Sequence, residues 1–134
     1  MKKALILFCV LAVAVSATLS CQKENQPSTP EDTIQAAMKA YQAKNFEKFV
    51  NHWELSSETE RALMIALYTD LDKSGSLPVV TRCEIVSTTI SKVDGVETAT
   101  VKYRLYYEGK PDKEYSGKLV KKDGKWLISS ASIK

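Results

Sequence analysis

The sequence is poor in the residues that build metal centres, disulfide frameworks and nucleophilic active sites. It has one histidine, three cysteines, five glycines and four prolines among 134 residues. It contains no Gly-x-Ser-x-Gly elbow, no phosphate-cradling glycine loop and no dinucleotide fingerprint. With no second histidine or cysteine at ligand spacing from His52, a zinc site is not expected. The chain therefore lacks a catalytic signature, and we predict that it needs no cofactor.

The charges of the chain are nearly balanced. Its 19 Lys and Arg residues stand against 16 Asp and Glu residues, which gives a formal net charge of +3 at pH 7. Such a small excess does not indicate a nucleic-acid-binding protein. Acidic residues predominate up to residue 72 and basic residues after it. This asymmetry predicts two solvated faces that attract each other or, alternatively, a basic surface that meets an anionic partner.

Only one cysteine lies in the part of the chain that is expected to fold. Cys9 belongs to an apolar N-terminal run and Cys21 follows that run, so Cys83 has no partner for an intramolecular disulfide. Cys83 stands in a strand-like stretch, residues 81–85. We expect it to be a small buried hydrophobe rather than a nucleophile.

The N-terminus has the organisation of an export signal. Lys2 and Lys3 precede an uncharged apolar run, residues 4–17, which is shorter than the roughly 20 residues of a membrane-spanning helix. Small residues then lead to Cys21. We therefore exclude this segment from the fold and interpret it as a targeting device.

The quartet Thr18-Leu19-Ser20-Cys21 resembles the bacterial lipobox, in which the cysteine receives lipid before cleavage, although the family pattern prefers leucine where Thr18 stands. The resemblance implies a signal peptide of residues 1–20 and a lipid anchor on Cys21. The alternative is ordinary cleavage after Ala17, which would release a freely secreted protein. Residues 22–25, Gln-Lys-Glu-Asn, resemble the signal that sends lipoproteins of the Bacteroidota to the cell surface. We therefore predict an exported protein anchored to the outer membrane and exposed outside.

The segment after Cys21 is predicted to be a linker. Residues 22–30 are polar, include two prolines and show no apolar periodicity. Together with Cys21 they form the lipidated tether, residues 21–30. Residues 31–134 are long enough for one hydrophobic core and are expected to form one domain.

Three amphipathic helices are predicted in the first half of that domain. A threonine that can cap, a proline at the first helical position and two acids make residues 29–32 a strong helix start. Ser56 or Ser57 is expected to cap the third helix. The apolar stripes, at i, i+3, i+4 and i+7, are Ile34, Ala37, Met38 and Tyr41; Phe46, Phe49, Val50 and Trp53; and Met64, Leu67, Tyr68 and Leu71.

The second half is predicted to be a sheet. From Leu77 onward the apolar period is two, and turn signals recur at residues 94–95, 109–112 and 123–124. One strand places a continuous apolar face on alternate residues: Ala99, Val101, Tyr103, Leu105 and Tyr107. The pattern predicts an α+β fold in which N-terminal helices pack on one face of a curved four-stranded antiparallel meander.

This order of elements resembles a known family of small bacterial lipoproteins. The capped helix, the aromatic turn Asn45-Phe46-Glu47-Lys48-Phe49 and the ending Gly124-Lys125-Trp126-Leu127-Ile128 are similar to domains with a nuclear-transport-factor-two-like, cone-shaped, cystatin-like fold. The resemblance covers residues 31–134 and implies a sheet that wraps around helices, with a pocket at the wide end. Relatives include isomerases, cyclases, dehydratases and members without known activity, so the fold leaves the function open.

The candidate pocket residues are Tyr103, Tyr107, His52 and Trp53. The two tyrosines can donate hydrogen bonds from the apolar strand face, whereas the only acid on that face is Glu97, which is expected to be solvated beside a hairpin. His52 is expected at the edge of the second helix, next to an inward-facing Trp53.

We therefore predict a membrane-anchored lipoprotein whose domain binds a small molecule, a glycan or a partner protein without catalysis. One alternative is an isomerase or hydratase that uses Tyr103 or Tyr107 with His52. Another is a structural subunit of an envelope complex.

Overall fold

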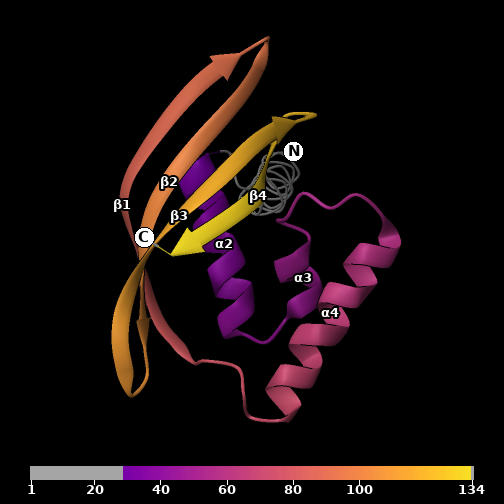
Figure 1. Ribbon diagram of the computed structural model, residues 1–134, viewed down its shortest axis with the longest axis vertical. Helices are drawn as coiled ribbons and strands as arrows, with labels where there is room; N and C mark the ends of the chain where they lie inside the picture. Colours follow the sequence, from indigo (N-terminus) through magenta and orange to yellow (C-terminus); the bar gives the residue numbers. More distant parts are fainter. Residues whose placement is uncertain (1–28, 134) are drawn as a thin grey trace, which may run out of the picture.

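The computed structural model describes residues 29–133. The predicted signal peptide, the lipid anchor on Cys21 and the linker up to residue 28 lie outside the described residues. The described residues form three helices followed by four strands, arranged as in Figure 1. They are α2 (Pro30–Gln42), α3 (Phe46–Val50), α4 (Glu58–Lys73), β1 (Val80–Val93), β2 (Val96–Tyr107), β3 (Lys110–Lys122) and β4 (Lys125–Ile133). Within residues 29–133, no helix is long and apolar enough to cross a membrane.

Helix α2 begins as its sequence predicts. The Thr29 hydroxyl accepts a hydrogen bond from the backbone N–H of Asp32 at 3.1 Å, and Pro30 occupies the first turn. This cap satisfies an N–H group that the helix itself leaves free. The predicted stripe of the helix faces the core, and Ile34, Ala37 and Met38 are buried.

Helix α3 is shorter than the predicted stripe, so the expectation that His52 and Trp53 lie on this helix is wrong. The helix ends at Val50, and the chain then turns toward the last strand. The backbone N–H of Ile128 donates to the carbonyl of His52, and the N–H of Glu54 donates to the carbonyl of Ile128, both at 2.8 Å. Trp53 thereby forms a parallel bridge with Ile128. Sheet pairing provides partners for backbone groups that a continued helix would have bonded internally.

Helix α4 has the predicted start, and its predicted stripe faces the core at Met64 and Tyr68 but not at Leu67. The Ser57 hydroxyl accepts from the N–H of Glu60 at 3.2 Å, and the Glu60 carboxylate accepts from the N–H of Ser56 at 2.9 Å. No residue of α4 is buried, and Leu67 of the predicted stripe is 56% exposed. Ile65 packs against the core in its place. Because every residue from 62 to 68 is apolar, periodicity could not distinguish Ile65 from Leu67 as an inward residue.

The four strands form the predicted antiparallel meander, in the order β1-β2-β3-β4. The tight turns at Asp94-Gly95 and Asp123-Gly124 have two consecutive residues of positive φ each, between 51° and 79°. Both positions of a type I′ turn require positive φ, and Asp-Gly satisfies this at low cost. The sequence signals for these two hairpins are therefore confirmed. The turn predicted at residues 109–112 lies instead at residues 108–109, and residues 110–112 belong to β3.

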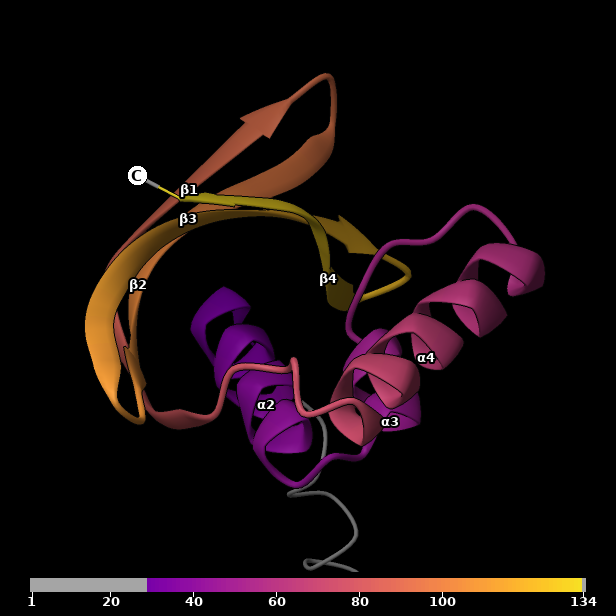
Figure 2. The ribbon, with the colours of Figure 1, turned by 60° about the horizontal axis from the view of Figure 1, so that its bottom comes forward.

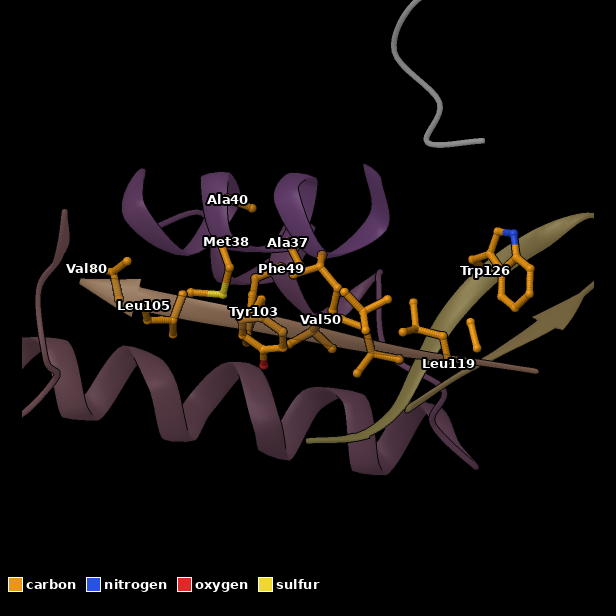
Figure 3. Close-up of a cluster of buried hydrophobic side chains, with 14 residues drawn as sticks. Ala37, Met38, Ala40, Phe49, Val50, Val80, Tyr103, Leu105, Leu119 and Trp126 are labelled. Carbon is orange, nitrogen blue, oxygen red and sulfur yellow. The ribbon is translucent and has the colours of Figure 1, made fainter. Parts of the chain in front are cut away.

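The sheet curls around α2, which lies in its concave side (Figure 2). Register shifts that indicate β-bulges occur in β1, near the end of β2 and between Lys118 and Leu119, and bulges bend strands. Tyr103 and Leu105 of the predicted inner face are buried against α2 (Figure 3). Gly117 permits this close packing, because a Cβ there would lie 3.2 Å from Tyr103 Cε1 and 3.4 Å from Ile34 Cδ1. The predicted α+β architecture, helices on one face of a curved sheet, is confirmed.

Candidate ligand-binding cavity

A cavity of about 410 Å³ lies between the helices and the concave side of the sheet. That volume is within the range of small-molecule sites, roughly 300 to 1,000 Å³. None of its lining residues carries a charge. They are Ile34, Ala37, Met38, Tyr41, Phe49, Trp53, Tyr68, Leu71, Leu77, Pro78, Val80, Tyr103, Leu105, Tyr107, Tyr115, Ile128, Ala131 and Ile133.

Three tyrosines of the sheet form one side of the cavity. Tyr103 and Tyr115 are directly opposite each other in β2 and β3, and their rings stack with centroids 5.5 Å apart and planes inclined by 14°. The Tyr107 and Tyr115 hydroxyls are hydrogen-bonded to each other. Because one hydroxyl of that pair donates and the other accepts, the pair keeps one proton for a further acceptor.

Tyr103 supplies a hydroxyl without a protein partner. Within residues 29–133 this hydroxyl makes no hydrogen bond, yet it is not among the polar atoms sealed from solvent. Figure 3 shows it on the side of the ring that faces away from α2. Since the ring lines the cavity, the hydroxyl is available to an acceptor on a bound molecule.

Burial keeps these phenols in their neutral, proton-donating form. Desolvation is the main cause that raises the pKa of Tyr103 and of Tyr107 well above the ordinary 10.0. It also raises the pKa of Tyr41 to about 12, and the Tyr41 hydroxyl donates to the Pro78 carbonyl at 2.6 Å. At physiological pH the cavity therefore presents hydrogen-bond donors and no phenolate.

Aromatic rings from the helices form the opposite side. Phe49 lies with its ring centroid 5.1 Å from that of Tyr68 and 6.1 Å from that of Trp53, both in edge-to-face geometry. Tyr41 contacts Phe49 in the same way, with centroids 5.7 Å apart. Such pairs contribute about 0.5–1.5 kcal/mol each beyond their buried area, so they stabilise this side of the cavity.

The structure brings together three of the four predicted pocket residues. Tyr103, Tyr107 and Trp53 line the cavity, whereas His52 does not. Burial, with a smaller contribution from Lys48, lowers the pKa of His52, and its Nε2 atom is buried without a hydrogen-bond partner in the described part of the chain. Glu97 pairs with Lys121 at 3.5 Å and is also outside the lining.

Sequence reasoning missed Tyr41, Tyr68 and Tyr115 as cavity residues. The first two belong to predicted helix stripes, which made them core residues in the sequence analysis. The position of Tyr115 opposite Tyr103 depends on the strand register. The turn signals indicate that β2 and β3 pair, but they do not give the register residue by residue.

Cys83 is half-buried and packs against the core. Desolvation raises the pKa of its thiol to about 11, which opposes formation of the nucleophilic thiolate. Among the side chains of residues 29–133, no group of three His, Cys, Asp or Glu residues is placed to hold a metal ion.

No family model matches the chain, and no curated protein matches its sequence. Solved structures do share its fold. An NTF2-like protein of Campylobacter jejuni is 20% identical with a TM-score of 0.57, and the match covers 77% of this chain and 99% of that one. A SEC-C motif protein of Rhodopseudomonas palustris is 16% identical over 84% of both chains, with a TM-score of 0.57.

An NTF2-like protein of Cytophaga hutchinsonii is 14% identical with a TM-score of 0.51, over 77% of this chain and 92% of that one. At these identities the likeness shows the fold alone. The domain described here is thus an α+β cone with an NTF2-like fold. The tyrosine-lined cavity lies inside this cone, between the helices and the sheet.

Proposed function

We propose that this protein binds a small, uncharged, flat and largely apolar molecule in the cavity of its cone. The observation that carries the proposal is the lining itself: about 410 Å³ of space lined by uncharged side chains, with the Tyr103 hydroxyl left without a hydrogen-bond partner among residues 29–133. The proposed ligand has a hydrogen-bond acceptor, such as a carbonyl oxygen, at one end.

The chemistry of the walls supports each part of this description. An anionic ligand would lose its hydration in the cavity without gaining a counter-charge, and that loss costs several kcal/mol. A flat ring can pack against Tyr103 and Phe49. An acceptor near Tyr103 receives a hydrogen bond from a hydroxyl that no group of residues 29–133 engages.

Binding is favoured over proton abstraction because the lining supplies donors without a base. Abstraction next to a carbonyl needs a carboxylate or imidazole within hydrogen-bond reach of the proton. The two candidates from the sequence, His52 and Glu97, both lie outside the lining. Tyr103 and Tyr107, with raised pKa values, are poor bases at neutral pH.

Two probes of the same shape, one neutral and one anionic, test the proposed binding. Acetylnaphthalene is flat, uncharged and ends in a carbonyl, whereas naphthoate ends in a carboxylate. Quenching of tryptophan fluorescence should report acetylnaphthalene through Trp53, which lines the cavity. The proposal predicts that acetylnaphthalene binds more tightly than naphthoate. Equal affinity, or preference for the anion, would contradict the proposed ligand class.

Matched variants locate the site of binding. Tyr103→Phe should weaken binding of acetylnaphthalene about 5- to 10-fold, the loss of one hydrogen bond of about 1 kcal/mol. Tyr106→Phe is the control, because the side chain of Tyr106 lies on the opposite face of β2 from that of Tyr103 and does not line the cavity. Ala131→Phe should obstruct the cavity, whereas Ser132→Phe on the neighbouring residue should not. Binding that survives Ala131→Phe would place the probe elsewhere.

We further propose that the domain is exported and anchored to the outer membrane through lipid on Cys21. The positively charged start, the apolar run and the lipobox-like quartet support this location. Cys21→Ser should abolish incorporation of a radiolabelled fatty acid, and Cys83→Ser should not. Label that persists in Cys21→Ser would refute the anchor.

A further inference from the structure

Helix α4 is apolar on more sides than the domain covers. Residues 62–68 read Ala-Leu-Met-Ile-Ala-Leu-Tyr, an uninterrupted apolar run of almost two turns. Its inner side packs on the core through Met64, Ile65 and Tyr68. Leu63 and Leu67 are 67% and 56% exposed. Helices that are apolar all round are normally buried on all sides, so the outer side of α4 lacks a partner within residues 29–133.

We call this side the α4 outer face. Its exposed residues are Thr59, Ala62, Leu63, Ala66, Leu67, Asp70 and Lys73. Figure 2 shows α4 at the periphery of the domain, beside α3 and away from the curved sheet. The positions 59, 63, 66, 70 and 73 follow alternate spacings of four and three, which is the seam by which two helices pair.

We propose that the α4 outer face is a dimer interface, in which α4 packs antiparallel against α4 of a second copy of this chain. The helix is self-complementary in this orientation. With a two-fold axis between Met64 and Ile65, Leu63 lies opposite Ala66 of the second copy, and Leu67 opposite Ala62. Each large side chain then meets a small one, which lets the two helices approach closely.

The polar ends of the face agree with the same pairing. Thr59 lies opposite Asp70 of the second copy, where its hydroxyl can donate to the carboxylate. Lys73, in the last turn, reaches the first turn of the other helix, where Glu58 is exposed. The two helix dipoles are antiparallel as well, which is the favourable arrangement.

A lipid surface fits the α4 outer face less well than a second copy does. Helices that lie in the membrane interface carry Lys and Arg on their polar side. Here the exposed charged residues of the helix are the acids Glu58, Glu60 and Asp70 and the single base Lys73. Arg61 lies on the inner side and is 3.8 Å from Glu47 of α3.

Sedimentation velocity of the protein purified from cells that express the full chain tests the dimer. At micromolar concentrations we expect twice the monomer mass, and Leu63→Glu or Leu67→Glu should give monomers with an unchanged circular dichroism spectrum. The matched control is Val93→Glu, which adds the same charge at a 60% exposed valine on β1 and should remain dimeric. A monomeric parent protein, or dimers that persist in both leucine variants, would overturn the proposal.

Cross-linking tests the register. A mixture of the Leu63→Cys and Ala66→Cys variants should form a disulfide-linked dimer far faster than a mixture of Leu63→Cys with Val93→Cys. Equal rates in the two mixtures would contradict the antiparallel pairing. Vesicles of neutral and anionic phospholipid provide the last comparison: if the parent protein binds them through Leu63, as shown by loss of binding in Leu63→Glu, a lipid surface rather than a second copy covers the face.

Discussion

A single methyl group added at Gly117 should destabilise the domain by crowding Tyr103. The Cβ of Gly117→Ala would lie 3.2 Å from Tyr103 Cε1 and 3.4 Å from Ile34 Cδ1. The isoleucine methyl can move, but the Tyr103 ring is stacked on Tyr115. Overpacking of this kind costs about 1–3 kcal/mol. Gly117 is not among the residues with positive φ, so its backbone conformation suits alanine. Alanine then stabilises the fold by about 0.4–1 kcal/mol, because it lowers the conformational entropy of the unfolded chain.

The net expectation is a loss of about 1 kcal/mol in the free energy of unfolding, measured by urea titration. For a domain of this size that loss corresponds to a decrease in Tm of roughly 4–8 °C. The same substitution in a Tyr103→Leu background should instead stabilise, because leucine has no atom at the Cε1 position. If Gly117→Ala has the same effect in both backgrounds, the contact with Tyr103 does not limit residue 117 and the reasoning is refuted.

Three further predictions concern other parts of the domain. The pKa of His52 is lowered in the folded state, so below its ordinary 6.5 the unfolded chain binds a proton that the folded protein does not. Stability should therefore fall as pH drops from about 7 toward 5. In urea titrations, His52→Gln should lessen this dependence of stability on pH. Ser57→Ala should cost about 1 kcal/mol of stability by removing the α4 cap, whereas an unchanged urea midpoint would argue against the cap. With a pKa of about 11, Cys83 should react with iodoacetamide at pH 8 at least about 100-fold more slowly than an exposed thiol of pKa 8.5, and comparable rates in peptide mass spectra would contradict its burial.

The parts of the fold that depend on local chemistry could be predicted from the sequence. The Thr29 cap and the following proline begin α2, and the Asp-Gly pairs at residues 94–95 and 123–124 form the expected hairpins. Strict alternation along β2 identified its buried face from Ala99 to Leu105. Each of these signals acts over a few residues, so no tertiary information is needed to interpret it.

The parts that depend on tertiary pairing could not be predicted in the same way. The stripe through Phe46 and Phe49 continues to Trp53, but pairing of His52 and Glu54 with Ile128 ends α3 earlier. In α4 the apolar run surrounds the helix, so Leu67 could not be distinguished from Ile65 as the inward residue. The cavity is a similar case, because it depends on side chains from three helices and four strands that meet only in the folded domain.

Crystals of the protein soaked with acetylnaphthalene would test the central claim most directly. We predict electron density for the probe within the cavity, with its ring between the tyrosines of the sheet and the aromatic side chains of the helices. Its carbonyl oxygen should lie about 2.7 Å from the Tyr103 hydroxyl, the usual length of such a hydrogen bond. A cavity that stays free of the probe at saturating concentration, or that is filled by its own side chains, would contradict the account.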